Sequence, residues 1–267
     1  MFLHWMKDRR RQQLLHEPFP ETWLAILEKN VSHYRLLNEE EKKRLRDDLR
    51  IFVAEKNWEG CGGLEMTDEI RVTIGALACL LNLAILHDHY KQVLSVLVYP
   101  TGYVAPQQTF IREGVVAEGA SGRLGEAWYR GPVVLSWQDA KLGGKHQQGG
   151  HNVVIHEFAH EHDMLNRGID GVPPMRDKQQ YERWESVMQP EYENLVRHVE
   201  MGFPTFIDPY GATNRAEFFA VTTECFFEEP LELERRHPAL YRELSGYYNQ
   251  DPASRIRAAQ SRSRRVP

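Results

Sequence analysis

The sequence has little cysteine and no long hydrophobic run. Its three cysteines, Cys61, Cys79 and Cys225, are widely spaced, and the chain contains no CxxC pair. An odd number of isolated cysteines argues against a disulfide framework and is typical of reduced thiols in a cytosolic protein. The longest apolar stretch, near residues 74–86, is about a dozen residues long and includes Asn82, which makes it too short to span a bilayer. We therefore expect a soluble, cytoplasmic protein.

The sequence also lacks an excess of positive charge, an internal repeat and an interdomain linker. Its formal net charge is −5, so the overall charge gives no support to a role in nucleic-acid binding. The apolar run at the N-terminus is too short for a secretory signal. Charge is unevenly spread, because residues 253–267 contain five arginines and no acidic residue. We interpret this basic tail as a solvated, disordered end, with contact to an acidic partner as the alternative.

What is present is a normal globular balance of 42% hydrophobic and 27% charged residues, enough to bury a core. Helical periodicity, with Asn38 and Thr67 as N-caps, predicts several helices. The glycine-rich centre of the chain, residues 102–137, has no helical periodicity. The expected helices are 21–30, 38–57, 67–87, 151–163, 178–199, 215–227 and 231–250. Short β-like runs at residues 92–100, 102–105, 114–119 and 131–137 predict a small sheet, and residues 141–150 read as a loop.

This order of helices, sheet and helices predicts an α+β fold, mostly helical with a small mixed sheet. We expect one domain over residues 21–252, with an N-terminal helical portion. Residues 1–20 are predicted to be a poorly ordered leader, and residues 253–267 form the basic tail.

The stretch HNVVIHEFAHEHD, residues 151–163, contains four histidines and three acidic residues. His156, Glu157 and His160 spell HExxH. Histidines at positions i and i+4 lie on one face of a helix, so both imidazoles can reach one ion. Imidazole and carboxylate ligands suit Zn²⁺. Glu157 follows the first ligand, where its carboxylate can accept a proton from metal-bound water.

Apart from Asp163, the remaining polar residues of this stretch do not lie on the helix face of His156 and His160 at the spacing of metal ligands. We interpret His151 and His162 as solvent or rim residues and Glu161 as solvent-facing. Asp163 lies on the ligand side, where it could orient an imidazole through its second ring nitrogen. The alternative for Asp163 is a surface acid at the C-terminus of the helix.

A catalytic zinc needs three protein ligands and an open position. The pattern HExxHxxGxxH is absent, so the third ligand is expected to be a glutamate from a later helix. Glu217 and Glu224 are seven residues apart and therefore lie on similar faces. We favour Glu217, which follows the loop carrying Tyr210, a possible donor to a developing oxyanion. Glu224 could instead hydrogen-bond a ligand histidine, or it could be a buried acid paired with an arginine.

The motifs GPVVLSW, HEFAHEHD, GVP and IDPYGATNRAEFFAVTTECFF together resemble the Mlc titration factor A family of bacterial zinc peptidases. The likeness runs from about residue 21 to residue 252, and its Tyr-x₆-Glu block is more specific than HExxH alone. The resemblance implies a zincin-like metallopeptidase core of gluzincin type, similar to that of anthrax lethal factor. It implies one Zn²⁺ held by His156, His160 and Glu217, with Glu157 as general base and Tyr210 assisting at the oxyanion.

The same resemblance implies partners. The family is known for aminopeptidase-like activity on model substrates and for binding the Mlc repressor of glucose phosphotransferase genes. We expect a peptide or protein substrate, the Mlc repressor as a partner, a monomer, and no direct contact with nucleic acid or membrane. The alternatives are a non-catalytic protein that sequesters the repressor through a structural or vestigial zinc site, and a hydrolase of non-peptide amides.

Overall fold

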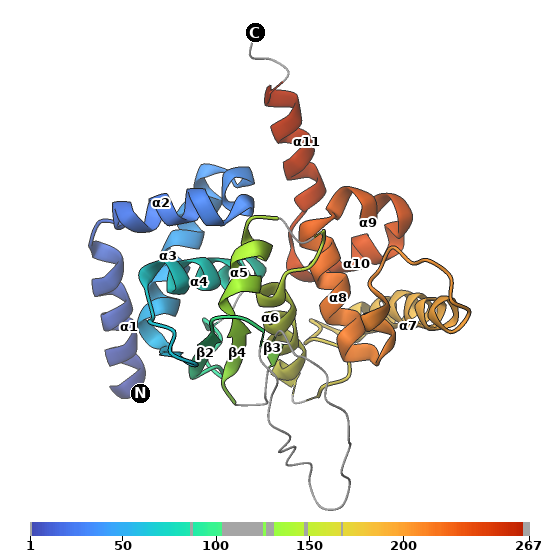
Figure 1. Cartoon of the computed structure of the whole chain (residues 1–267), viewed down its shortest axis with the longest axis horizontal. Coiled ribbons are helices and arrows are strands. Elements are labelled where there is room, and N and C mark those ends of the chain that lie inside the picture. Colours follow the sequence, from blue (N-terminus) through green and yellow to red (C-terminus); the bar gives the residue numbers. More distant parts are fainter. Residues whose placement is uncertain are drawn as a thin grey trace, which may run out of the picture.

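A computed structural model describes residues 2–85, 88–102, 125–126, 131–146, 149–166 and 168–263 of the chain. The fold is α+β and mostly helical, as predicted. In Figure 1 the N-terminal helices lie on one side of a small sheet and the C-terminal helices lie on the other. Among the described residues, no helix is both long enough and apolar enough to cross a membrane.

The N-terminal portion contains α1 (Phe2–His16), α2 (Glu21–Asn30), η1 (Ser32–Leu36), α3 (Glu39–Glu55) and α4 (Asp68–Asn82). Asn38 caps α3 in a full capping box: its side chain accepts from the amide of Glu41, whose carboxylate accepts from the amide of Asn38. Thr67 caps α4, which ends at residue 82, earlier than the predicted residue 87. Both predicted N-caps are therefore confirmed.

The structure differs from the prediction at both ends of the chain. Where we expected a poorly ordered leader, α1 is a helix whose Arg11 donates to both carboxylate oxygens of Glu55 on α3, at 2.6 and 2.8 Å. The basic tail forms α11 (Pro252–Ser263), which projects from the body in Figure 1. Arg255 of α11 pairs with Glu41 at 2.6 Å. Ion pairs to α3 thus hold residues at both ends that composition alone marked as disordered.

The sheet has four strands in the order β1-β2-β4-β3. β1 (Asn57–Gly60), β2 (Ser95–Tyr99) and β4 (Val133–Ser136) are parallel, and β3 (Gly125–Glu126) is antiparallel to β4 at the edge. The small mixed sheet is therefore confirmed. The predicted β-like runs at residues 103–105 and 114–119 lie outside the described residues.

The C-terminal portion contains α5 (Trp137–Gly144), α6 (Val153–Asp163), η2 (Met164–Asn166), α7 (Lys178–Glu200), η3 (Pro209–Ala212), α8 (Arg215–Glu228), α9 (Pro230–Arg236) and α10 (Pro238–Tyr248). α5 occupies residues 141–144, which we predicted to be loop. The single helix predicted over residues 231–250 is two helices, because Pro238 has no amide hydrogen to continue α9 and instead occupies the first turn of α10.

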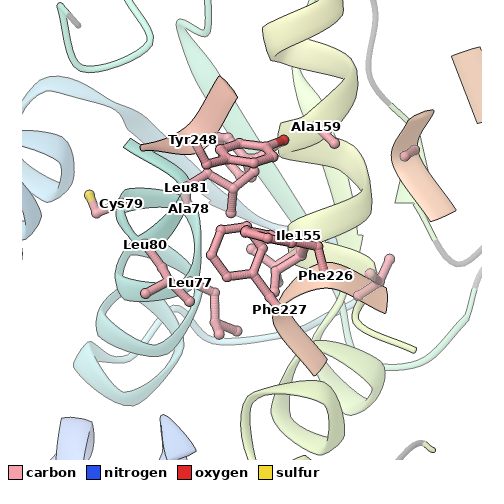
Figure 2. Packing of buried hydrophobic residues seen from close by; sticks show 14 of the residues in the cluster. Leu77, Ala78, Cys79, Leu80, Leu81, Ile155, Ala159, Phe226, Phe227 and Tyr248 are labelled. Carbon is pink, nitrogen blue, oxygen red and sulfur yellow. The ribbon is translucent and has the colours of Figure 1, made fainter. Parts of the chain in front are cut away.

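The helix that carries HExxH, α6, is held in the centre of the core. It packs against α4, α8 and the sheet. Figure 2 shows Ile155 of α6 beside Phe226 of α8 and Ala159 of α6 near Tyr248, with leucines of α4 alongside. The buried Phe158 of α6 meets Tyr90 edge to face, with ring centroids 4.8 Å apart. Because close-packed side chains surround the helix, its polar face is held in a fixed orientation.

Candidate metal centre

The site begins with two histidines on α6. Asn152 is the N-cap of this helix, and its side-chain oxygen accepts from the amide of Ile155 at 3.2 Å. One turn of helix separates His156 from His160, so their rings meet edge to face with centroids 4.9 Å apart. The two Nε2 atoms are 3.2 Å apart. The spacing read from the sequence therefore places two potential ligand atoms side by side.

Glu217 reaches the same point from the first turn of α8. Asn214 caps that helix by accepting from the amide of Glu217 at 3.0 Å. Glu217 Oε2 lies 3.1 Å from His156 Nε2 and 3.4 Å from His160 Nε2. In the part of the chain that the structure describes, no other three His, Cys, Asp or Glu side chains bring ligand atoms together in this way. Glu224, the other candidate, is not in the cluster.

These distances fit a tetrahedral ion. Zinc bonds of about 2.0 Å place neighbouring ligand atoms of a tetrahedron about 3.3 Å apart. The three observed separations of 3.2, 3.1 and 3.4 Å lie around that value. Burial raises the pKa of the Glu217 carboxyl, but hydrogen bonds from His156 and His160 lower it far below its ordinary value, so the group is a carboxylate. Two imidazoles and one carboxylate are a donor set that zinc accepts.

Glu157 is buried next to this cluster, with 4% of its surface exposed. Its Oε2 atom has no hydrogen-bond partner among the described residues. Burial raises the pKa of Glu157 to about 7, although the positive charges of His156 and His160 oppose the shift. A carboxyl group with a pKa near neutrality can both accept and release a proton under ordinary conditions.

Tyr210 lies at the rim of the cluster. Its amide donates to Asp208 Oδ1 at 2.7 Å, which fixes the short helix η3 that carries it. Its ring centroid is 6.0 Å from that of His156, and the residue is 54% exposed. His151 Nε2 lies 3.2 Å from Asp208 Oδ2 and is exposed, in agreement with its predicted place at the rim. The loop before α8 and the start of α6 therefore meet at this edge.

Glu224 lies behind His156, where it makes the hydrogen bond that one of our two interpretations predicts. Its Oε1 is 2.7 Å from His156 Nδ1, and its Oε2 accepts from the Asn152 amide at 2.6 Å. Burial lowers the pKa of His156, but the charge of Glu224 and the hydrogen bonds of His156 to Glu217 and Glu224 raise this pKa well above its ordinary value. A carboxylate at Nδ1 keeps a proton there, so a metal ion that displaced the Nε2 proton would meet an Nε2 lone pair directed at the ligand cluster.

Asp163 is neither the surface acid nor the imidazole partner that we considered. It is fully buried, and its two oxygens accept from the amides of Gly171 and Val172, each at 2.9 Å. Gly171 has φ +75°, and a Cβ there would lie 2.3 Å from the carbonyl oxygen of Arg215. Asp163 therefore holds a loop directly against the start of α8. His160 Nδ1 has no hydrogen-bond partner among the described residues.

Two predictions on the remaining polar residues of α6 are wrong. His162 is only 2% exposed: Tyr90 lies 3.1 Å from its Nε2 and Tyr247 lies 2.8 Å from its Nδ1. Glu161 is 1% exposed, and burial raises its pKa to about 7. Neighbouring elements cover α6 on these faces, so side chains that looked solvent-facing in sequence are inside the protein.

The sequence reasoning also missed Asn152 and Glu228. An asparagine just before a helical run is a recognised cap signal, and it could have been found. Glu228 had no such signal, because its partner His33 is 195 residues away in the chain.

A helix presenting two histidines one turn apart, next to a glutamate from a later helix, is the arrangement of a metallopeptidase. The chain belongs to the family described as "Glucose-regulated metallo-peptidase M90", whose sequence model matches residues 5–249. It is 40% identical to an uncharacterized protein of Synechocystis sp. over 250 residues, covering 93% of this chain and 90% of the relative.

Two further relatives are named Mlc titration factor A. The one from Yersinia enterocolitica is 33% identical over 267 residues, covering 98% of this chain and 96% of its own. The one from Yersinia pestis is 34% identical over 258 residues, covering 95% of this chain and 91% of its own. The family resemblance predicted from the motifs is thereby confirmed.

Proposed function

We propose that the protein is a zinc-dependent peptidase of gluzincin type, with one Zn²⁺ held by His156, His160 and Glu217. The observation that carries this proposal is the convergence of three ligand atoms at separations of 3.1 to 3.4 Å. The match to a metallopeptidase family over most of the chain supports it independently.

The roles of the surrounding residues follow from their positions. A zinc ion bound here would polarise the substrate carbonyl and lower the pKa of water. Glu157 accepts a proton from the attacking water and then delivers it to the leaving amine. Tyr210, beside His156 at the open rim, donates a hydrogen bond to the developing oxyanion. Glu224 keeps His156 in the orientation that binds metal.

The test of this mechanism is the variant Glu157→Gln. Glutamine has nearly the same shape but cannot take up the proton, so zinc content should stay that of the wild type. Peptide hydrolysis should fall by about 10²- to 10⁴-fold, the usual contribution of a general base. Metal analysis and a peptidase assay on the same preparation measure both quantities, and an unchanged rate would remove Glu157 from the mechanism.

We further propose aminopeptidase-like specificity. Peptides with a free amino terminus should be cleaved, and the same peptides with an acetylated amino terminus should not. Cleavage at internal bonds of the blocked peptides would point to an endopeptidase instead, and hydrolysis of simple amides alone would favour the non-peptide hydrolase.

The name of the Yersinia relatives, Mlc titration factor A, supports a second role that we propose, binding of the Mlc repressor and hence modulation of glucose phosphotransferase gene expression. The competing proposal is that repressor binding is the only function and the metal site is vestigial. Repressor binding by Glu157→Gln separates the two roles, because a catalytically dead protein that still binds Mlc shows that binding needs no catalysis. We place the protein in the cytoplasm, which its three free cysteines support. We also propose that it acts as a monomer.

A further inference from the structure

A chain of buried hydrogen bonds leads away from His156, the proposed zinc ligand. Its first link is Glu224, which contacts His156 Nδ1 through Oε1 and accepts from the Asn152 amide through Oε2. A carboxylate held at both oxygens cannot rotate without losing one of these bonds. The orientation of Glu224 is therefore set by the backbone of residue 152.

Asn152 is in turn fixed on several sides. It is fully buried, its Oδ1 caps α6 by accepting from the Ile155 amide, and its Nδ2 donates to Glu228 Oε1 at 2.7 Å. Gly143 of α5 packs so closely that a Cβ at that position would lie 3.0 to 3.2 Å from atoms of Asn152. Neither the rotamer nor the backbone of Asn152 is free to change on its own.

Glu228, one turn beyond Glu224 on α8, is the last residue in this series of hydrogen bonds. Its side chain is fully buried, its Oε1 also lies 3.0 Å from His33 Nε2, and its Oε2 contacts His146 Nδ1. Burial raises the pKa of Glu228, but the charge of His33 and hydrogen bonds from His146, His33 and Asn152 lower it to about 2. A carboxylate that is charged at neutral pH thus joins α8 to η1, to the end of α5 and to the start of α6.

We propose, on the basis of the zinc centre proposed above, that Glu228 and Asn152 are positioning residues that hold Glu224, and through it His156, in the geometry that binds metal. Neither residue touches the ligand cluster. Glu228 holds Asn152 through Nδ2, Asn152 holds Glu224 through its backbone amide, and Glu224 holds the His156 ring. The relay ties the metal ligand to elements more than 100 residues earlier in the chain, through His33 of η1.

Two variants test this relay. Glu228→Gln keeps the shape but removes the charge that holds Asn152 Nδ2, His33 and His146. Asn152→Ser keeps an N-cap for α6 but is too short to reach Glu228, which separates capping from the relay. Thr223→Val is the matched control, because Thr223 is a fully buried α8 residue whose hydroxyl bonds Tyr248, outside the relay.

Zinc affinity, measured by competition with a chelator, should weaken about 10- to 100-fold in Glu228→Gln and in Asn152→Ser, the range for residues that orient metal ligands. Thr223→Val should bind zinc like the wild type. In the wild type, the His156 Nδ1 proton should give a strongly deshielded nuclear magnetic resonance signal. The two relay variants should shift or lose it, whereas Thr223→Val should retain it.

Wild-type zinc affinity and an unshifted His156 signal in both relay variants would overturn the proposal. If Glu228→Gln does not fold, Asn152→Ser decides. If zinc affinity is weakened in Asn152→Ser but unchanged in a folded Glu228→Gln, Glu228 is not part of the relay, and the proposal as stated is also overturned. His156→Ala distinguishes this failure from that of the proposed function: if it binds zinc as tightly as the wild type, the centre itself is misplaced.

Discussion

Glu217 and Glu224 lie on the same helix and both contact His156, so their substitution by alanine gives the sharpest comparison in the site. Glu224→Ala removes one charge-assisted hydrogen bond to His156 Nδ1, which is worth about 1.5 to 3 kcal/mol. That energy corresponds to a loss in zinc affinity of about 10- to 100-fold, because each 1.4 kcal/mol is a factor of ten. Glu217→Ala removes an atom of the cluster itself and leaves only two imidazoles, so its loss should exceed about 100-fold, beyond the range for supporting residues.

The assay is zinc binding at equilibrium with a competing chelator, with circular dichroism to show that each variant is folded. Glu224→Ala also leaves the buried Asn152 amide without its acceptor, which should cost about 1 to 3 kcal/mol of folding stability. Glu217→Ala loses its contacts to the rings of His156 and His160 but leaves no backbone amide without an acceptor, so its thermal stability without metal should be closer to that of the wild type. A larger loss of zinc affinity in Glu224→Ala than in Glu217→Ala would refute the assignment and exchange the two roles.

Three further predictions concern the surroundings of the site. Gly171→Ala should destabilise the protein and weaken zinc binding, because its positive φ and its contact with the Arg215 carbonyl leave no room for a Cβ; wild-type stability and affinity would contradict this. His162→Ala should lower the free energy of unfolding by about 2 to 4 kcal/mol, because it opens a cavity and leaves the Tyr247 hydroxyl without its partner, whereas the Tyr90 hydroxyl keeps its bond to the Ala78 carbonyl; zinc content should stay unchanged, and a loss of bound metal would contradict this. The pKa of Glu228 is lowered from 4.5 to about 2, so the unfolded chain binds more protons between these values. Stability should therefore fall as pH drops through this window, and denaturant titrations of Glu228→Gln should show a smaller fall.

Local patterns in the sequence predict the elements that depend on interactions between residues close together in the chain. The caps Asn38 and Thr67, the parts of the helices near them and the strand before Pro100 follow from hydrogen bonding and periodicity within a few residues. The spacing of His156 and His160 predicts their shared face for the same reason. The mostly helical α+β fold class followed from the order of these elements.

The errors occurred where distant parts of the chain decide the outcome. His162 does not share the face of His156 and His160 at ligand spacing, which predicts a solvent or rim residue, and nothing near it in sequence indicates Tyr90 or Tyr247. The same holds for Glu161, which neighbouring elements bury. The sequence predicts poorly ordered ends, whereas Glu55 and Glu41, both on α3, pair with Arg11 and Arg255.

The choice of Glu217 over Glu224 lay between these cases. Both glutamates lie on similar faces of α8, so periodicity could not separate them. Position in the first turn, next to the loop of Tyr210, favoured Glu217, and the structure brings Glu217 into the cluster while Glu224 lies behind His156. Helical periodicity therefore leaves two candidates for the third ligand, Glu217 and Glu224. Which of them reaches the histidines depends on where α8 packs against α6.

The central claim is that the cluster is a working peptidase centre in which Glu157 moves the proton. The most direct measurement is peptide hydrolysis by zinc-loaded Glu157→Gln, compared with zinc-loaded wild-type protein of equal metal content. The account predicts that hydrolysis falls by about 10²- to 10⁴-fold while bound zinc is unchanged. Hydrolysis at the wild-type rate by the fully loaded variant would contradict it.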